Sequence, residues 1–242
     1  MTTTVTFTRA YDPGPSATGT GAISLTDAGQ LLFAGGGHPE LDMSKPTHHA
    51  RIMAEMQEVR DRGGLVAIEC IRGGIYLSKT SWHSGAALIE TARVEGRLLE
   101  CAVSVGLTPI EVGAKQWMAD YCRTTYPSPQ QIRIIVEGTI GGLPRFHHLD
   151  REHAYDGLAI ASLVLAQHHK IRLRWPASVQ VAVWEQQQFE KAERARKGAA
   201  TRAAKAAGQP VSATPLKRWK TSAQRKAIGA GVVAANRAKR TQ

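Results

Sequence analysis

The sequence predicts an α/β fold in which helices cover both faces of a sheet. Strand-like segments gather in the first part of the chain, and strand-like and helix-like segments then alternate, as in folds of this class. One short segment, residues 65–70, is almost wholly apolar, which is typical of a strand buried on both faces. The sequence has no repeat of about 20–50 residues, which excludes solenoids and propellers.

Three strands begin the predicted sheet. Residues 5–11 are rich in Val, Phe, Tyr and Thr and stop at the turn sequence DPGP. Residues 18–26 and 30–34 form the next two strands, which are joined by a hairpin turn at the sequence DAG. We expect residues 35–37, a run of three glycines, to form a loop that ends this meander.

Helices then alternate with strands. Residues 45–62 carry Ile52, Met56 and Val59 at helical spacing, and two glycines end this helix before the apolar strand. A second helix is predicted over residues 84–105. Its expected buried face consists of Leu88, Ala92, Leu99 and Val103.

Four more helices follow a predicted strand at residues 108–112. They are expected at residues 114–123, from Ser128 onward, at 150–166 and at 178–196. Ser128 is a typical N-cap, and the proline after it suits the first helical position. This helix would bury Ile132, Ile135 and Val136, although a strand is an open alternative for the same segment.

The excess of positive over negative charge lies entirely in the C-terminal part of the chain. The net charge is +11, yet residues 1–189 hold 17 basic and 18 acidic side chains. Residues 190–242 hold 14 basic and two acidic side chains, together with 15 alanines. This distribution excludes a uniformly basic ribosomal-type protein. It predicts a globular domain at residues 1–175, a connecting helix at 176–198 and a basic arm at 199–242.

Nothing in the sequence indicates a membrane or secretory protein. The chain has no run of about 18 apolar residues, and its first residues lack the pattern of a secretory signal. Cys70, Cys101 and Cys122 are odd in number and far apart, so neither a disulfide framework nor a thiolate zinc site is indicated. We therefore expect a cytoplasmic protein that has no membrane partner.

Acidic residues stand at three positions that call for an explanation. Asp12 follows the first strand, Glu69 lies near the end of the apolar strand, and His153 and Asp156 share one face of a helix. Each has a plain structural explanation as part of a turn, an ion pair or a helix cap. Burying a bare carboxylate costs several kcal/mol, so these groups must be paired, solvated or bound to metal. Together they would form the oxygen-rich site that Mg²⁺ prefers, and two such ions can promote phosphodiester cleavage.

Three segments of the chain resemble a known family. The segments AYDPGPSATGTGAISL, LVAIEC and EHAYDGLAIAS, in this order and at these separations, are similar to the RuvC family of Holliday-junction resolvases, which have a ribonuclease H-like fold. The similarity covers about residues 5–170. It implies a mixed sheet with helices on both faces, to which a helical or disordered basic C-terminal extension is added. By motif, the metal ligands and catalytic residues of the family fall on Asp12, Glu69, His153 and Asp156.

The resemblance also implies an activity. A homodimer would nick opposing strands of a four-way DNA junction with two Mg²⁺ or Mn²⁺ ions in each active site, and no small molecule would be the substrate. Asp12 would bridge both metals, Glu69 and Asp156 would each help to hold one, and His153 would be a ligand or orient the attacking water. The chain departs from the family in several ways. His153 stands where Asp is commoner, and Gly157 replaces the usual Ala. The basic residues before the last helix are sparse, and the extension beyond Lys170 has no recognised counterpart.

A loop next to Glu69 has the composition of a DNA contact. Residues 71–82 combine glycines and aromatics with two cations, so Arg72 and Lys79 would contact phosphates and Tyr76 an unstacked base. An ordinary surface loop is an equal alternative. The family also has basic residues between the late strand and the last helix. The candidates here are Lys115, Arg123, Arg133 and Arg145.

The arm cannot build a core, because it contains one Leu, one Ile and one Trp. We expect a helix at residues 190–205 and another from about 222 to 238. The predicted DNA contacts of the arm are Lys217, Arg218, Trp219, Lys220, Arg225 and Lys226. A solvated tail is the alternative.

Three other functions compete with a junction resolvase. One is a ribonuclease H-like nuclease that acts on other branched DNA or on RNA–DNA hybrids. Another is a non-catalytic DNA-binding protein in which the acids are structural. The third is an actin-like ATPase, because the DPGPSATGTG turn also resembles a phosphate loop, but the body is too short for the duplicated domain of that fold.

Overall fold

The computed structural model describes residues 6–14, 18–25, 31–37, 45–71, 85–140, 145–146, 152–171 and 173–206. The chain divides into two compact units, Met1–Gln188 and Phe189–Gln242. The first unit contains the sheet and five of the helices, and the described part of the second unit is helical.

Six strands form one mixed sheet. They are β1 (Phe7–Asp12), β2 (Gly19–Leu25), β3 (Leu31–Gly37), β4 (Leu65–Cys70), β5 (Ile110–Gly113) and β6 (Arg145–Phe146). Their order is β5-β4-β1-β2-β3-β6. The first three strands are antiparallel neighbours, whereas β4 is parallel to β1 and β5 is parallel to β4. The short β6 is parallel to β3 and forms the edge of the sheet beside it.

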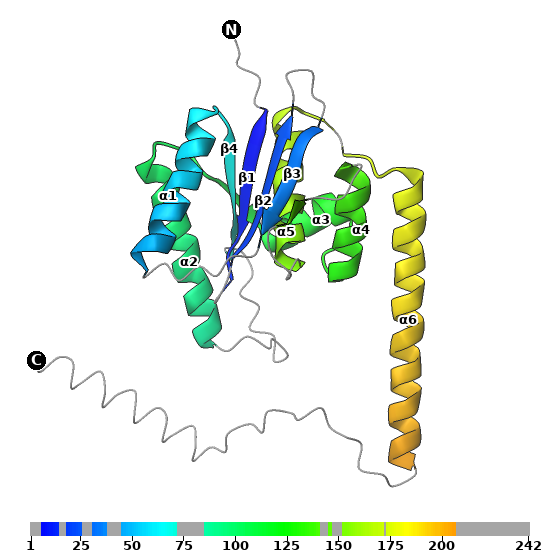
Figure 1. The fold of residues 1–242 in the computed structure, drawn as a ribbon. Coiled ribbons are helices and arrows are strands. Elements are labelled where there is room, and N and C mark those ends of the chain that lie inside the picture. Colours follow the sequence, from blue (N-terminus) through cyan, green and yellow to red (C-terminus); the bar gives the residue numbers. More distant parts are fainter. Residues whose placement is uncertain are drawn as a thin grey trace, which may run out of the picture. The chain divides into compact units, whose positions relative to one another are not determined.

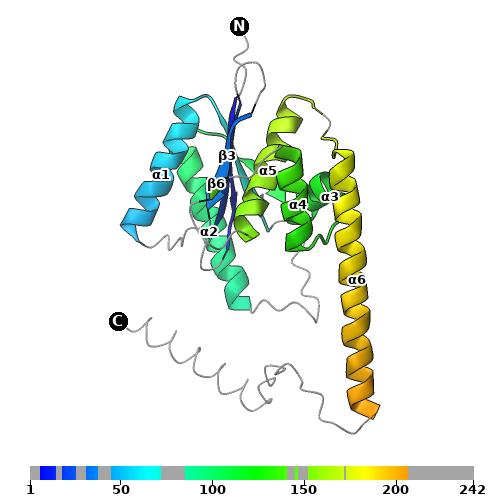
Figure 2. The ribbon, with the colours of Figure 1, turned by 45° about the vertical axis from the view of Figure 1, so that its right-hand side comes forward.

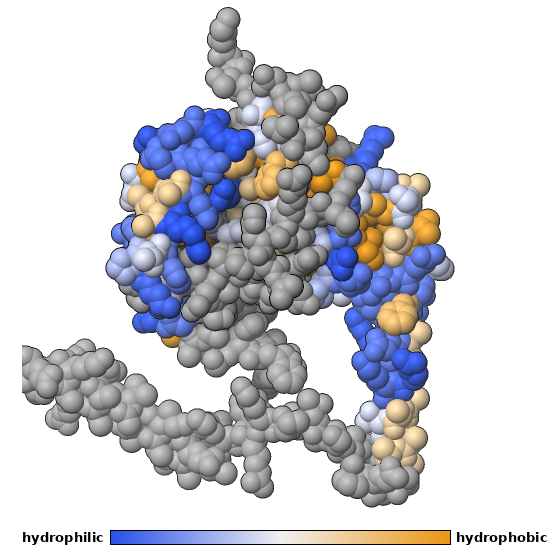
Figure 3. All heavy atoms as spheres, viewed as in Figure 1, coloured by the Kyte–Doolittle hydropathy of each residue, from blue (hydrophilic) through white to orange (hydrophobic). Residues whose placement is uncertain are grey.

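Helices cover both faces of this sheet (Figures 1 and 2). One face carries α1 (Pro46–Asp61) and α2 (Gly85–Ser104), and the other carries α3 (Ala114–Cys122), α4 (Pro129–Ile140) and α5 (Glu152–His168). The exposed surface of α1 is hydrophilic, as expected for a helix whose apolar side faces a sheet (Figure 3). The predicted fold class is therefore confirmed.

Side chains of the central strands point alternately to the two faces of the sheet, so neighbouring residues pack against different helices. Phe7 and Tyr11 of β1 pack in the core beneath α1 and α2, whereas Ala10 packs in the core beneath α5. In β4, Val66 and Ile68 face the first core, and Ala67 faces the second. A strand buried on both faces has few polar positions, and this explains why β4 is nearly all apolar.

Two helices begin and pack as the sequence predicts. In α1, Ile52, Met56 and Val59 are the buried residues. The segment after Ser128 is a helix and not a strand, because the Ser128 hydroxyl accepts a hydrogen bond from the backbone N–H of Gln131 at 3.2 Å. Its buried residues include the predicted Ile132, Ile135 and Val136.

The prediction of a loop at the three glycines is wrong. Gly35, Gly36 and Gly37 are the last residues of β3 and pair with β2. A Cβ added to Gly36 would overlap the carbonyl oxygen of Thr20 on the neighbouring strand. The glycines therefore permit a close approach of two strands and do not end the sheet.

The predicted buried face of α2 is also wrong. Val103 is 64% exposed and Ala92 is exposed, while the side chain of Leu88 lies outside the described residues. Leu99 packs at the edge of the core. The core face of α2 instead consists of Val94, Leu98, Cys101, Ala102 and Val105. The helix thus carries two apolar stripes, and only one of them is buried.

The last described helix, α6, spans Ala177–Ala206. Its first turns bury Val179 and Val183 against the core beneath α5. It continues as a helix through residues 190–205, as predicted, so it crosses the predicted start of the arm at 199. The domain boundaries themselves stay a prediction. Among the helices that the structure describes, none has the length and apolar character needed to cross a membrane.

Candidate functional site

The two strand-borne acids lie at the same end of the sheet. Tyr11 of β1 is paired with Ile68 of β4 in parallel register, and Asp12 and Glu69 are the next residues along the two strands. Because side chains alternate, Asp12 shares a face with Ala10, and Glu69 shares that face with Ala67. Both carboxylates therefore extend toward the side of the sheet that α5 covers.

Glycines place the start of α5 directly on β2. A Cβ added to Gly19 would overlap the backbone carbonyl of His153, and one added to Gly21 would overlap the backbone of Leu158. On the helix side, a Cβ on Gly157 would lie 2.6 Å from the backbone nitrogen of Gly21. Helix and strand touch through their backbones, so the first turn of α5 is held within reach of Asp12. This contact accounts for Gly157, which the sequence analysis noted as a departure from the usual Ala.

Three of the four candidate ligands converge. The Nδ1 atom of His153 lies 2.8 Å from Oδ2 of Asp12 and 3.8 Å from Oδ2 of Asp156. One ligand atom from each of these residues lies within 4.8 Å of the others, so the group could hold a metal ion. The Asp12 side chain is 13% exposed and that of His153 is 49% exposed. The group is therefore mostly buried at Asp12 and accessible to solvent at His153.

Glu69, the fourth candidate, stands outside this group of three. Its Oε2 atom accepts a hydrogen bond from the indole Nε1–H of Trp117 at 2.8 Å. Burial, followed by the negative charge of Asp12, raises the pKa of the Glu69 carboxyl well above its usual value, and Asp156 acts in the same direction. The Trp117 hydrogen bond opposes this rise. Glu69 thus experiences the charge of both aspartates.

The donor set fits a hard divalent cation. Three carboxylates gather here, and among the described residues that act on Glu69 the half-exposed imidazole of His153 is the one that could carry a compensating positive charge. A cation would offset the burial of the Glu69 carboxylate and its repulsion by Asp12, the two main causes of the raised pKa of Glu69, and carboxylate oxygens are the ligands that Mg²⁺ and Mn²⁺ prefer.

The predicted DNA-contact residues are only partly described. Lys115 is exposed in the first turn of α3, directly after β5. Arg123 lies over the ring of Trp175 at 4.5 Å, and Arg133 pairs with Glu137 at 3.0 Å, so both have partners within the body. The other predicted DNA contacts lie outside the described residues. In the loop after Glu69 these are Arg72, Tyr76 and Lys79, and in the arm they are Lys217, Arg218, Trp219, Lys220, Arg225 and Lys226. The side chain of Arg145 also lies outside the described residues.

The sequence analysis missed Trp117. One signal for it was present in the sequence: an aromatic residue with a polar atom lies in the first turn of the helix predicted at residues 114–123. That helix follows β5, the strand beside β4. That signal gives the place of the residue along the chain but not the acceptor of its N–H. The bond spans 48 residues and depends on how α3 packs.

A second group of ligand-type side chains lies on the opposite face of β4. Cys70, Glu95 and Glu111 have ligand atoms within 4.8 Å of one another. Burial and then the charge of Glu95 raise the pKa of the Cys70 thiol to about 12, so the thiol keeps its proton. Its Sγ donates to Glu111 at 3.5 Å, and Glu95 accepts the backbone N–H of Ile71 at 3.1 Å. These hydrogen bonds account for the group. Cys70, Cys101 and Cys122 are all free and buried.

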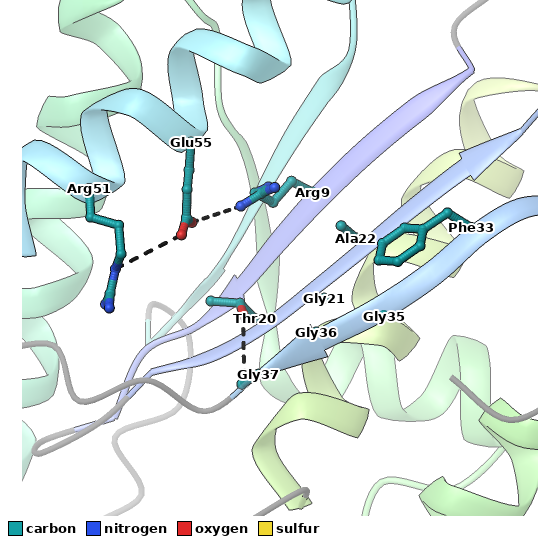
Figure 4. A pocket seen from close by; sticks show the side chains of 10 residues that line it. All are labelled: Arg9, Thr20, Gly21, Ala22, Phe33, Gly35, Gly36, Gly37, Arg51 and Glu55. Carbon is teal, nitrogen blue, oxygen red and sulfur yellow. Dashed lines mark hydrogen bonds and ion pairs between the residues drawn. The ribbon is translucent and has the colours of Figure 1, made fainter. Parts of the chain in front are cut away.

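A pocket of about 310 Å³ also lies away from the acids, on the α1 side of β2 and β3 (Figure 4). Glu55 stands between two cations there, 2.8 Å from Arg9 and 3.9 Å from Arg51. The Thr20 hydroxyl donates to the carbonyl of Gly37. None of the four candidate ligands lines this pocket.

No known family model matches the sequence, and no curated protein does. Among solved structures, the chain is similar to RuvC of Thermus thermophilus, with 22% identity and a TM-score of 0.48 over 68% of this chain and 96% of that one. It is also similar to T. thermophilus RuvC in complex with a Holliday junction substrate, with 20% identity and a TM-score of 0.46 over 67% and 96%. The yeast mitochondrial Holliday junction resolvase Ydc2 has 11% identity and a TM-score of 0.39 over 77% and 85%.

Proposed function

We propose that the protein is a metal-dependent, structure-selective endodeoxyribonuclease that nicks four-way DNA junctions, a crossover junction endodeoxyribonuclease. The convergence of Asp12, His153 and Asp156, with Glu69 beside them, carries this proposal. The four residues come from β1, β4 and α5, so the fold itself assembles the group. An inert DNA-binding protein gains nothing from carboxylates gathered at one end of its sheet, because they repel phosphate.

The acids would hold two Mg²⁺ or Mn²⁺ ions. Asp12 is central to the group and would contribute to both metal positions, while Glu69 and Asp156 would each complete one. When bound, such a pair of ions activates a water and stabilises the leaving 3′ oxygen of a phosphodiester. His153, half exposed at the open side, would serve as a ligand or orient the water. Its hydrogen bond holds the carboxylate of Asp12 in place.

DNA would contact three segments of the protein. Lys115 is exposed on α3, whose first turn follows the strand next to Glu69. The loop residues Arg72, Tyr76 and Lys79 would contact phosphates and an unstacked base. The basic arm after residue 199 would add general electrostatic attraction, which the near-neutral body lacks.

We further propose a homodimer that forms through α2. Five apolar or small residues follow one another at spacings of three and four along its outer side: Ile89, Ala92, Gly96, Leu99 and Val103. Ile89 is 56% exposed and Val103 is 64% exposed. A Cβ added to Gly96 meets no atom of the described residues within 4 Å, so these residues leave room for a second helix at the middle of this stripe.

Charge favours a second copy as the partner. Arg93, which pairs with Glu90, and Glu100, which pairs with Arg97, flank the stripe on the same side, on either side of Gly96. A two-fold axis through Gly96 would run two α2 helices antiparallel and set each Arg93 beside the Glu100 of the partner subunit. A dimer of this kind presents two acidic groups, as paired nicks in a four-way junction require.

The decisive experiment offers the full chain labelled four-way, Y-shaped, hybrid and linear substrates, each with Mg²⁺, Mn²⁺ or a chelator. Symmetric nicks confined to the four-way junction, and only with metal, are expected. Cleavage of hybrids or Y-shaped DNA instead would assign the protein to another ribonuclease H-like activity. Junction binding without any cleavage would make it a non-catalytic DNA-binding protein and overturn the proposal.

A further inference from the structure

Trp117 makes an unusual contact beneath the acidic group. Its ring is fully buried in the core between the sheet and α5. Its one polar atom, Nε1–H, donates to Oε2 of Glu69 at 2.8 Å. A buried indole N–H needs an acceptor, but a backbone carbonyl is sufficient. Trp175, for example, donates to the carbonyl of Tyr121 at 3.0 Å.

The fold brings Trp117 to this place. β5 is parallel to β4, and Val112 of β5 is paired with Glu69. The chain then enters α3 at Ala114, so the first turn of α3 turns back over the end of β4 where Glu69 lies. Trp117 is fully buried in this turn, whereas Lys115 beside it is exposed.

The kind of donor matters for a carboxylate that binds metal. Glu69 has two oxygens, and the indole engages Oε2; within the part of the chain that the structure describes, no other hydrogen bond to Glu69 is found, so Oε1 can face a metal. A lysine or arginine in place of the indole would neutralise the carboxylate and compete with a cation. The indole is neutral, so it fixes the orientation of Glu69 and leaves its charge for the metal.

We propose that Trp117 is a positioning residue for the metal site, which holds Glu69 by Oε2 so that Oε1 completes one cation position. This inference rests on the proposed function, because it assumes that the acids hold divalent cations. It adds a residue that neither the motifs nor the resemblance supplied.

Removal of the N–H without removal of the ring tests the proposal. Trp117→Phe keeps an aromatic ring and deletes the donor. Trp175→Phe is the matched control, since it deletes the hydrogen bond of a second, partly buried indole N–H, whose acceptor lies outside the acidic group. Binding of Mn²⁺ is measured by calorimetry on each full-length variant without DNA, after circular dichroism shows that the variant is folded. We expect Trp117→Phe to weaken Mn²⁺ binding by about 10–100-fold, as loss of a hydrogen bond to a metal ligand typically does, and Trp175→Phe to leave it unchanged.

A double-mutant cycle connects the effect to Glu69. In a Glu69→Gln background, Trp117→Phe should cause no further loss of Mn²⁺ affinity, because the carboxylate that the indole orients is gone. Three results would overturn the proposal. Trp117→Phe could weaken Mn²⁺ binding by the same factor in the Glu69→Gln background, Trp175→Phe could weaken it as much as Trp117→Phe does, or Trp117→Phe could leave the Mn²⁺ affinity unchanged. If the phenylalanine variant fails to fold, replacement of Trp117 by benzothienylalanine, which has sulfur in place of N–H, carries the same expectations.

Failure of this inference can be distinguished from failure of the proposed function. If Asp12→Asn and Glu69→Gln weaken Mn²⁺ binding but Trp117→Phe does not, only the positioning role is wrong. If none of the acidic variants changes Mn²⁺ binding, the acids hold no metal and both proposals are wrong.

Discussion

The Nδ1 atom of His153 lies 2.8 Å from Oδ2 of Asp12, although 141 residues separate them in the sequence. This contact joins the first turn of α5 to the end of β1, and it exists because glycine backbones let the helix rest directly on β2. The hydrogen bond and a cation would both engage the Asp12 carboxylate. Asp12 is therefore the residue on which the proposed chemistry most depends.

Asp12→Asn should abolish cleavage while junction binding is largely retained. The amide keeps the shape of the side chain and a hydrogen-bonding oxygen for His153, but it loses the charge that a bridging metal ligand needs. Cleavage and gel-shift assays on the same four-way junction measure the two effects. Full activity in this variant would contradict the assignment of Asp12.

Glu69→Gln should stabilise the metal-free protein in a pH-dependent way. Burial, together with the charge of Asp12, raises the pKa of Glu69, so the folded state holds this proton to higher pH than the unfolded state does. Wild-type stability should therefore fall as the pH rises above the ordinary Glu value of about 4.3, and the fall should end once the raised pKa is passed. The variant lacks this loss, so its advantage should grow over that window and then level off.

Urea unfolding in the presence of a chelator, measured across the pH range, tests this expectation. Glu90→Gln, which alters an exposed glutamate on α2, is the control and should show no growing advantage. Saturating Mg²⁺ should reverse the order of wild type and Glu69→Gln, because the metal binds the intact acidic group more tightly. A pH-independent difference between the two proteins would contradict the prediction.

The sequence predicted the parts of the fold that periodicity and turn residues determine. The apolar strand at residues 65–70 and the helix that buries Ile52, Met56 and Val59 follow from local pattern alone. The positions of Asp12 and Glu69 at strand ends were also readable, because parallel neighbours end at one edge of a sheet.

What could not be read depends on contacts between distant segments. Helix α2 has two apolar stripes, and periodicity does not say which one meets the core; the exposed stripe that ends at Val103 was chosen wrongly. Three consecutive glycines are typical of a loop, and only the neighbouring strand shows why they are needed in β3. A side chain at Gly36 would overlap the backbone of Thr20. The acceptor of Trp117 was likewise set by the packing of α3 and not by its own sequence.

Gly157→Ala should disturb the site without touching a ligand. The added Cβ would press against the backbone of β2 and move the first turn of α5 away from Asp12. Overpacking of this kind costs about 1–3 kcal/mol, so the unfolding midpoint should fall even though Ala is the better helix former. The Mg²⁺ concentration needed for half-maximal cleavage should rise. Gly198→Ala, in α6, is the control and should neither lower the unfolding midpoint nor raise this Mg²⁺ concentration, because its Cβ has an ordinary contact with Arg202.

Val103→Glu should convert the proposed dimer into monomers. The substitution places a charge in the exposed apolar stripe of α2, where two copies would bury it. Ser104→Glu adds the same charge at the next exposed position, outside the stripe, and should leave the dimer intact. Light scattering during size-exclusion chromatography gives the mass of each variant. Monomeric wild-type protein, or equal masses for the two variants, would rule out this interface.

Truncation after Gly198 should weaken DNA binding and flatten its salt dependence. The removed segment carries ten of the basic residues of the chain and no acidic residue, so its contacts with DNA would release condensed counterions. Each lost phosphate contact reduces the slope of log K against log salt by about 0.9 for duplex DNA. The cut leaves the sheet and α1 to α5 complete, so cleavage at low salt should persist at saturating enzyme. Binding titrations of both proteins at several salt concentrations measure the slope; an unchanged affinity and slope would show that the arm does not bind DNA.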